Sequence, residues 1–338
     1  MPKLTLSFIS QFNERVQPLM DGTIQPEGLE VIPTYSHPAE TFWRQLKFQE
    51  FEIAEMSLSS YLIARSRGVV DMVALPVFPS RWLFHTWFAV HTDSGVQEPG
   101  NLVGKRIGVA EYQQTAALWT RGILEHDFGV SQYNVDWYME RTEQLSHGGV
   151  TGFTPPPGIS FHRIPPDKNM ASMLVSHELD AAAVLGPWAR VASLLDRSSR
   201  VPRRGGDWSK VKPLFPDPIA EGARFFKKHR FVPANHTYII RGDIHRKYPW
   251  VASNLYTGFV KAKAVALEKL TERIPSALFF GPEYLAMTRN IFGDDPFPYG
   301  LTANRPMLEL LIDYSHEQGL TASKMRVEEL FAESTLNL

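Results

Sequence analysis

Apolar positions along the chain form short runs that alternate with helical repeats. Helical spacing continues from Gln114 to Phe128, and Gly129 is a suitable stop for that helix. The short runs predict strands at Leu4–Ile9, Leu29–Thr34, Phe51–Met56, Met72–Phe78, Trp87–Thr92 and Arg106–Ala110. Strands that alternate with helices are typical of α/β layering, so we expect an α/β fold.

Two similar segments suggest an internal repeat. Arg44–Ala54 and Ser172–Ala182 each contain a helix end, an acidic residue and a short strand. One interpretation is the general pattern of α/β proteins, and the other is two similar lobes that face one cleft. On the second interpretation the chain crosses between lobes twice, near Ala89–His91 and near Asn235–Ile240. The expected division is residues 1–90 and 237–338 for lobe I and residues 91–236 for lobe II.

The second half of the chain contains a loosely patterned stretch, Leu195–Arg230, rich in arginine and proline. It lacks the interleaved aromatics of a nucleic-acid stacking surface, so we interpret it as a solvated linker. A strand is predicted at Thr237–Arg241, and Asp243 is a suitable N-cap for a long amphipathic helix. The apolar side of that helix contains Val251, Leu255 and Phe259.

Composition narrows the function classes. The 338 residues exceed one typical core, so two domains are expected. A formal net charge of -1 gives no general attraction to nucleic acid. The absence of cysteine excludes thiol nucleophiles, thiolate zinc sites and disulfides. Met1–Lys3 leads into the first strand without a secretory signal, and no window approaches the roughly 20 apolar residues of a membrane span. We expect a cytoplasmic protein with no membrane partner.

Two of the apolar runs end in polar loops, as buried strands do where they open onto a site. The first run is followed by Ser57, Ser59 and Ser60, whose hydroxyls and adjacent helix start suit an anion. The second is followed by Arg81 and His85, which are four residues apart and therefore predicted to share a side. A carboxylate-binding cleft is the first hypothesis.

Several segments, spread over most of the chain, carry a family likeness. They are Leu19–Thr23, Pro26–Gly28, Glu55–Tyr61, Pro76–Arg81, Leu102–Val109, Glu111–Gln113 with Thr115–Ala116, and Phe215–Ile219. In these segments the chain resembles 4,5-dihydroxyphthalate decarboxylases. The resemblance implies the fold of type 2 periplasmic binding proteins, with two α/β lobes around a central cleft. Because that fold mostly serves transport, it does not by itself imply an enzyme.

The resemblance also implies an activity in aromatic compound catabolism, specifically phthalate degradation. A carboxy-lyase would convert 4,5-dihydroxyphthalate to 3,4-dihydroxybenzoate (protocatechuate) and CO2 without oxidation. The hydroxyl para to the carboxylate supplies electron density when an acid protonates the ring carbon, so no cofactor is expected. The competing class is a non-catalytic solute-binding protein that captures an aromatic carboxylate for transport or sensing.

Three places depart from the family pattern. The first is Asn13–Arg15, where the family has an aromatic residue and an aspartate before the arginine. The second is the loop Leu185–Arg190, and the third is the Gly/Pro-rich insert at 147–158. These departures affect the expected ring pattern of the substrate more than the expected fold.

Arg81 is the expected anchor, since a guanidinium matches a carboxylate with two parallel hydrogen bonds, and a structural ion pair is the alternative. His85 is the first candidate acid because the ordinary pKa of histidine lies near neutrality, and a packed core histidine is the alternative. Glu111 is a second candidate if it is desolvated, and otherwise it favours a helix start. His236 is the third candidate.

Further residues are predicted to contact the substrate. The three serines would bind the second carboxylate or a ring hydroxyl, with helix capping as their alternative role. Tyr112 and Thr115 are expected contacts from the second lobe, and Arg15 is one from the first. Trp188 would stack on an aromatic ring, or it packs in the core.

Other chemistries find little support in the sequence. Gly100–Arg106 imitates a phosphate loop, but it precedes its strand and lacks the final Ser or Thr. The 11 histidines show no metal-ligand spacing, so no metal is indicated. The expected partner is a small aromatic dicarboxylate, and the sequence leaves a homo-oligomer open.

Overall fold

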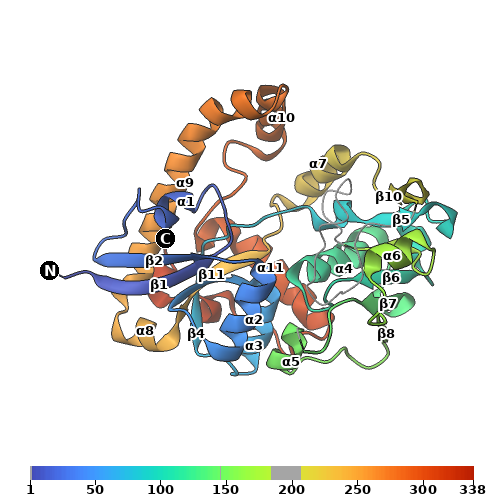
Figure 1. Cartoon of the computed structure of the whole chain (residues 1–338), viewed down its shortest axis with the longest axis horizontal. Coiled ribbons are helices and arrows are strands. Elements are labelled where there is room, and N and C mark those ends of the chain that lie inside the picture. Colours follow the sequence, from blue (N-terminus) through green and yellow to red (C-terminus); the bar gives the residue numbers. More distant parts are fainter. Residues whose placement is uncertain (1, 145, 184–206) are drawn as a thin grey trace. The chain divides into compact units, whose positions relative to one another are not determined.

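The structure, a computed structural model, describes residues 2–144, 146–183 and 207–338. It divides the chain into two compact units, each with its own mixed sheet (Figure 1). Unit 1 comprises Met1–Trp82, Phe226–Leu310 and Met325–Leu338, and unit 2 comprises Leu83–Phe225 and Leu311–Lys324. The expected α/β class with two lobes is confirmed.

The sheet of unit 1 has the strand order β2-β1-β3-β11-β4. Strand β1 is parallel to β2 and β3, whereas β11 is antiparallel to both β3 and β4. The strands are β1 (Leu4–Ser10), β2 (Leu29–Tyr35), β3 (Ile53–Ser57), β4 (Met72–Leu75) and β11 (His236–Arg241). The helices are α1 (Gln17–Met20), α2 (Pro38–Phe48), α3 (Leu58–Ser66), α8 (Gly242–Lys247), α9 (Trp250–Ala277) and α10 (Gly281–Phe292).

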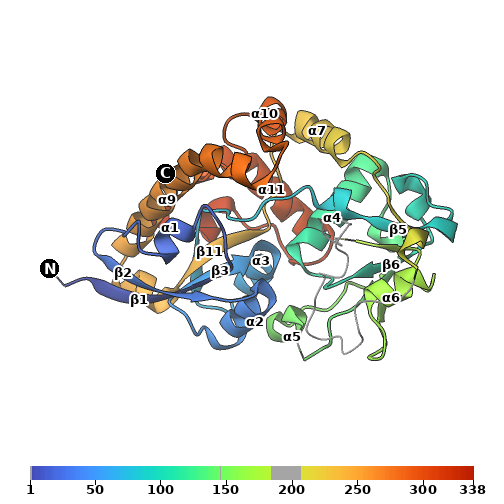
Figure 2. The same cartoon turned by 45° about the horizontal axis from the view of Figure 1, so that its top comes forward.

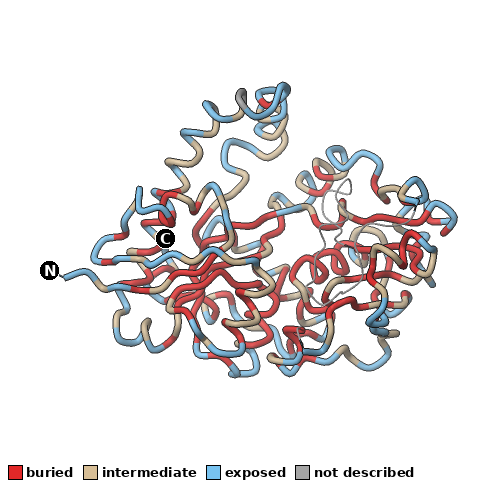
Figure 3. Tube along the Cα trace, viewed as in Figure 1, coloured by how far each residue is buried: buried red, intermediate tan, exposed pale blue. Residues whose placement is uncertain are grey.

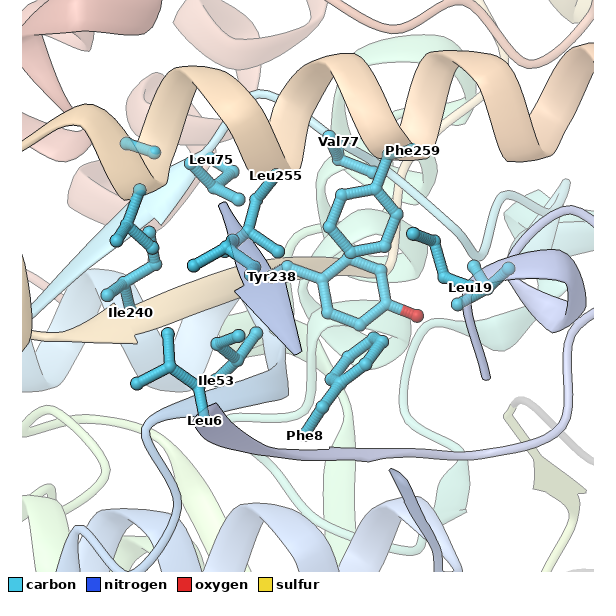
Figure 4. Packing of buried hydrophobic residues seen from close by; sticks show 14 of the residues in the cluster. Leu6, Phe8, Leu19, Ile53, Leu75, Val77, Tyr238, Ile240, Leu255 and Phe259 are labelled. Carbon is cyan, nitrogen blue, oxygen red and sulfur yellow. The ribbon is translucent and has the colours of Figure 1, made fainter. Parts of the chain in front are cut away.

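Helices α1 and α9 cover one face of this sheet, and α2 and α3 cover the other (Figures 1 and 2). The core on the α9 side contains three aromatic rings packed together among aliphatic side chains. Tyr238 lies between Phe8 and Phe259, with ring centroids 5.5 and 4.4 Å away (Figure 4). Val251, Leu255 and Phe259 are fully buried, which confirms the predicted apolar side of the helix.

The sheet of unit 2 has the strand order β10-β5-β9-β6-β7-β8. Its strands are β5 (Ala89–His91), β6 (Arg106–Val109), β7 (Asp136–Met139), β8 (Ser160–Arg163), β9 (Ala181–Ala182) and β10 (Val211–Pro213). Its helices are α4 (Thr115–Phe128), α5 (His147–Thr151), α6 (Met170–Val175) and most of α7 (Pro218–His229). Gly108 in β6 permits close packing of α6, because a Cβ there would lie 2.6 Å from Met170 Cγ.

The chain returns to unit 2 near its carboxyl end, through the last part of α11 (Leu301–Glu317) and the segment that follows. Tyr314 packs so closely on α4 that a Cβ at Gly122 would lie 2.1 Å from its ring. The two predicted crossings and the limits at residues 90 and 237 did not include this return. This return of the chain to unit 2 depends on packing between distant segments, which the amino-acid composition does not reveal.

Two local predictions from the sequence are wrong, and a third corresponds to a feature of the structure. The interpretation of 195–230 as a linker is wrong for its described part, 207–230, because β10 pairs with β5 and α7 is a regular helix. Asp243 is not an N-cap, since it lies in the first turn of α8 and pairs with Arg241. The similarity of Arg44–Ala54 to Ser172–Ala182 corresponds in each unit to a helix followed by a strand.

Burial is concentrated on the strands and on α4, whereas α10 is mostly exposed (Figure 3). In the part of the chain that the structure describes, no helix combines the length and the apolar character needed to cross a bilayer.

Candidate active site

Strands β1, β3 and β4 end at the edge of the unit 1 sheet where β11 begins. The register sets His236, the first residue of β11, opposite Ser57, the last residue of β3. The loop after β4 reaches the same edge, because Arg81 forms a β-bridge with Ala234. Open α/β sheets bind ligands at the carboxyl ends of their strands, so this edge is the candidate active site of unit 1.

His236 and Glu55 form a buried pair at this edge. The Nδ1 atom of His236 lies 2.6 Å from Glu55 Oε1, and its Nε2 atom lies 2.9 Å from Asn235 Nδ2. Because an amide NH2 group only donates, Nε2 is the acceptor and the proton sits on Nδ1. The ring also packs edge-on against Phe42, with 4.8 Å between centroids. A carboxylate that fixes the tautomer and orientation of a histidine is the arrangement of general acid–base catalysis.

Glu55 is held by several neutral donors. Ser10 Oγ donates at 2.9 Å, and Gln11 donates from its backbone N–H at 3.0 Å and from Nε2 at 2.9 Å. The Ser10 hydroxyl also hydrogen-bonds the Tyr238 hydroxyl at 2.8 Å. Burial raises the pKa of Glu55, but His236 and the donors from Gln11 and Ser10 outweigh it, so the pKa lies below its usual value. Glu55 is therefore an anion that orients His236.

The serine loop begins helix α3. Ser57 is its N-cap, with the Oγ atom accepting from the Ser60 N–H at 3.5 Å, and the hydroxyls of Ser57 and Ser59 lie 3.4 Å apart. Ser59 and Ser60 lie inside the helix, because α3 begins at Leu58. All three serines are buried. The capping role belongs to Ser57, and a ligand role for the serines stays a prediction.

Arg81 is 4% exposed and is held by oxygen atoms of its own unit. Its Nη1 donates to the Val232 carbonyl at 2.8 Å, and its Nη2 donates to the Pro298 carbonyl at 2.9 Å and to Asn304 Oδ1. Burial lowers the pKa of Arg81 to about 9, so the guanidinium remains charged at neutral pH. Its role as substrate anchor stays a prediction.

Arg15 follows β1 and is half-buried. Its Nη2 donates to the Pro79 carbonyl at 2.6 Å, and its guanidinium stacks on the Phe297 ring at 3.7 Å. Within residues 2–144, 146–183 and 207–338, no carboxylate forms an ion pair with Arg15 or Arg81. Unit 1 thus carries two arginines at this edge without an acidic partner.

His85 lies in the other unit. Its Nε2 is 2.7 Å from Glu221 Oε1, and its ring packs against Phe215 and Phe225 at 5.5 and 5.3 Å. The side chain is 0% exposed, and burial lowers the pKa of His85 more than Glu221 raises it. Arg81 and His85 were expected to share a side of one regular segment, but Arg81 belongs to unit 1, whereas His85 lies in the short 3-10 helix Phe84–Trp87 of unit 2. The regular geometry on which that expectation rested is therefore absent.

Glu111 follows β6 and lies at the centre of a buried network in unit 2. Arg141 Nη1 donates to its Oε2 at 2.6 Å, Ser146 Oγ donates to its Oε1 at 2.5 Å, and the His147 N–H donates at 3.3 Å. Burial raises the pKa of Glu111, but Arg141, His147 and Ser146 lower it below its usual value. In this state Glu111 is a carboxylate and carries no proton to donate.

A pocket of about 270 Å³ opens beside Glu111. The insert at 147–158 forms α5 and the loop after it, and both contribute to the pocket wall. The lining includes Gln113, Ser146, Gly148, Phe153, Phe161 and Arg163. The insert, one of the three departures from the family pattern, therefore shapes this pocket of unit 2.

The other predicted contacts have different surroundings. The Tyr112 hydroxyl donates to Gln132 Oε1 at 2.7 Å, and Arg121 stacks on the Tyr112 ring at 3.8 Å. Thr115 is the buried first residue of α4. Trp188 lies outside the described residues. Their contacts with substrate stay predictions.

Sequence reasoning missed three polar partners in these networks: Glu55, Arg141 and Ser146. Glu55 gave a readable signal, because a single acid inside an apolar strand must be paired when it is buried. Arg141 and Ser146 gave none, since they meet Glu111 only through tertiary contacts between segments that are distant in the chain. Among the described residues, no group of three or more histidine or acidic side chains could hold a metal ion.

Solved structures place the chain in a fold class. It aligns over 98% of its length with the periplasmic aliphatic sulphonate binding protein of Escherichia coli, covering 92% of that chain at a TM-score of 0.54 and 11% identity. A desulfurization enzyme aligns over 98% of this chain and 97% of its own, at a TM-score of 0.55 and 13% identity. The fold is that of periplasmic binding proteins, and it includes both binding proteins and an enzyme. The profile of the family described as ABC transporter, phosphonate, periplasmic substrate-binding protein matches residues 10–151.

Curated relatives define the family. The 4,5-dihydroxyphthalate decarboxylase of Comamonas testosteroni is 32% identical over 338 residues, which is 99% of this chain and 98% of the relative. A protein of the same name from Pseudomonas putida is 37% identical over 189 residues, 56% of this chain and 72% of the relative. The chain belongs to the 4,5-dihydroxyphthalate decarboxylase family.

Proposed function

We propose that this protein removes one carboxylate from 4,5-dihydroxyphthalate and releases 3,4-dihydroxybenzoate and CO2. The observation that carries the proposal is membership of the decarboxylase family over 99% of the chain. The buried pair of His236 and Glu55 adds the acid–base group that such a reaction needs.

The reaction requires one proton to arrive at the ring carbon that loses its carboxylate. The hydroxyl para to that carbon loses its proton and pushes electron density into the ring, while the acid protonates the carbon. The carbon–carbon bond then breaks, its electron pair restores the aromatic ring as a phenolate, and CO2 departs. The phenolate oxygen then takes back the proton that it lost. The ring itself stores the electrons, so the chemistry depends on proton transfer and orientation.

His236 is the proton donor in this proposal. Glu55 fixes the ring through Nδ1, which leaves Nε2 as the atom that takes up and delivers the proton. The candidate ranked first in the sequence, His85, is enclosed by Phe215 and Phe225 and kept neutral by burial. Glu111 is kept ionised by Arg141. Both therefore suit structural roles better than proton donation.

Arg15 and Arg81 supply positive charge for the dicarboxylate. Each is anchored to main-chain carbonyls, so the charge is held in place before a ligand arrives. Ser57, Ser59 and Ser60 lie at the same sheet edge and remain proposed contacts, as do Tyr112, Thr115 and Trp188.

The direct test is turnover. Purified protein incubated with 4,5-dihydroxyphthalate should release CO2 and accumulate 3,4-dihydroxybenzoate over many cycles. In deuterium oxide the product ring should gain one deuterium at the carbon that lost the carboxylate. Stoichiometric binding without product, across a panel of hydroxylated aromatic acids, would instead establish the solute-binding function. Location in the cytoplasm is a further proposal, which cell fractionation tests.

A further inference from the structure

A cluster of cationic and phenolic side chains lies beside the proposed acid–base pair in unit 1. Its members are Arg15, Arg81, Tyr299 and Lys263. The positive charges of Arg15 and Arg81 both act on the Tyr299 hydroxyl, and the ammonium of Lys263 lies 4.6 Å above the Tyr299 ring. Tyr299 is only 8% exposed.

The Arg15 side chain lies within hydrogen-bonding reach of the Tyr299 hydroxyl, whose oxygen can accept from it. That contact leaves the phenolic proton without an acceptor among the described residues, and Arg81 Nε lacks an acceptor as well. A buried donor without an acceptor costs about 1–3 kcal/mol, so two such donors in one cluster need an explanation. The missing partner must be an acceptor.

The charges within the cluster indicate the charge of that acceptor. Asp295 is the acid that acts on Arg81 and Tyr299, and it is paired with Lys263, whose Nζ lies 2.5 Å from Asp295 Oδ2. The two arginines have no ion pair with an acid in the described part of the chain. The cluster therefore has an excess of positive charge, which suits an anion.

The cluster borders the network of His236. Tyr238 is subject to the charges of both Glu55 and Arg15, and its hydroxyl bonds Ser10, which donates to Glu55. An anion bound by the arginines would thus lie close to the pair that delivers the proton.

We propose that Arg15, Arg81 and Tyr299 form the subsite for the carboxylate that stays on the ring, with the Tyr299 hydroxyl as a direct donor to it. This inference rests on the proposed decarboxylation. The departing carboxylate becomes neutral CO2, so strong cationic binding would stabilise the ground state and slow its loss. The retained carboxylate keeps its charge throughout, and cations can hold it without that penalty.

The reaction product makes a direct probe, because 3,4-dihydroxybenzoate carries only the retained carboxylate. In Tyr299→Phe we expect the dissociation constant for 3,4-dihydroxybenzoate to rise about tenfold, as for the loss of one hydrogen bond to a charged group. The KM for 4,5-dihydroxyphthalate should rise by a similar factor with kcat little changed, because the contact is the same in ground and transition states. Binding of catechol, which lacks a carboxylate, should not change.

Thermal stability separates this role from a structural one. Tyr299→Phe removes a buried hydroxyl whose proton lacks an acceptor among the described residues, so the Tm should change little. Tyr61→Phe is the matched control, since the buried Tyr61 hydroxyl donates to the Leu330 carbonyl at 2.5 Å and accepts from the Ala74 N–H at 3.2 Å. The control should lose Tm and keep its affinity for 3,4-dihydroxybenzoate.

The subsite is refuted if Tyr299→Phe binds 3,4-dihydroxybenzoate as tightly as the wild type. It is also refuted if the wild type does not bind this ligand, or if catechol binding weakens equally. A wild type that releases no CO2 but binds 3,4-dihydroxybenzoate through Tyr299 would refute the decarboxylase proposal and support a carboxylate subsite. The two failures are therefore distinguishable.

Discussion

The two buried histidine–glutamate pairs have almost the same separation, 2.6 Å for His236 and Glu55 and 2.7 Å for His85 and Glu221, but different surroundings. Glu55 receives its remaining hydrogen bonds from neutral groups of Ser10 and Gln11. Glu221 is also paired with Arg224, which binds Asp127 as well. Glu55 thus pairs with His236 and otherwise binds neutral groups, whereas Glu221 belongs to a larger ionic network.

The two pairs also differ at the ring nitrogen that the glutamate does not contact, and this difference affects proton transfer. Nε2 of His236 faces an amide at the edge of a sheet, and the residue retains 6% exposure. Nδ1 of His85 has no hydrogen-bond partner among the described residues, and the ring lies between two phenylalanines. The distance within a histidine–glutamate pair therefore does not identify a catalytic dyad. What identifies it is whether the ring nitrogen that the glutamate does not contact is accessible, and how far the ring is solvated.

Replacement of each histidine by glutamine tests most directly whether the two pairs differ in function. We expect His236→Gln to lower kcat by about 10²-fold or more, because glutamine keeps a hydrogen bond but cannot deliver a proton as an imidazolium does. Binding of 3,4-dihydroxybenzoate should persist. Both are measured from CO2 release and from equilibrium titration of the ligand.

His85→Gln is the matched variant, since it removes the imidazole of the other buried histidine–glutamate pair. We expect it to lower the Tm and to keep most of the turnover. If His85→Gln loses turnover while His236→Gln retains it, the acid is His85, and the assignment first drawn from the sequence is right.

The pH dependence of the free energy of unfolding should report the burial of His85. Burial lowers the pKa of His85 below its usual 6.5, so the unfolded chain binds this proton more readily than the folded chain. Protonation therefore favours unfolding: the stability is complete above about pH 6.5 and decreases as the pH falls. Relative to His85→Gln, the wild type should lose up to about 1.4 kcal/mol per pH unit below that point. Urea unfolding of both proteins between neutral and mildly acidic pH measures it, and parallel curves would contradict it.

The aromatic enclosure of His85 provides a smaller test. Phe215→Leu should cost about 1 kcal/mol of stability through imperfect repacking, and it should admit water to the ring. The pKa of His85 should then move upward toward its ordinary value, which NMR titration of the imidazole resonances follows. Phe42→Leu, beside His236, is the corresponding variant in unit 1. An unchanged pKa in Phe215→Leu would show that desolvation is not what keeps His85 neutral.

The sequence predicted what depends on local periodicity. The β1 and β2 strands and the buried side of α9 follow from alternation and helical spacing, and the structure confirms them. It did not predict the choice between the two histidines, because Glu55 and His236 are 181 residues apart and meet only through sheet register. His85 was the first candidate because the ordinary pKa of histidine lies near neutrality, a property that every histidine of the chain shares. Its expected side in common with Arg81 assumed one regular segment, whereas His85 lies in the 3-10 helix Phe84–Trp87 of the other unit. The return of residues 311–324 to unit 2 was equally hidden, since it depends on the fit of Tyr314 against Gly122.

The hydrogen bond from Asn235 to Nε2 of His236 gives the smallest expected effect and the finest test. Asn235→Ala removes a restraint of about 1 kcal/mol on the imidazole, so kcat should fall by about fivefold while Glu55 still fixes the ring through Nδ1. Asn235→Asp should cost more, because a carboxylate at this position would compete with Glu55 for the imidazole proton and leave the tautomer unspecified. Both are measured as kcat from CO2 release, with the affinity for 3,4-dihydroxybenzoate as the check that the site is intact. If Asn235→Ala lowers kcat as much as His236→Gln does, then the amide itself takes part in the chemistry, and the role of His236 is to position it.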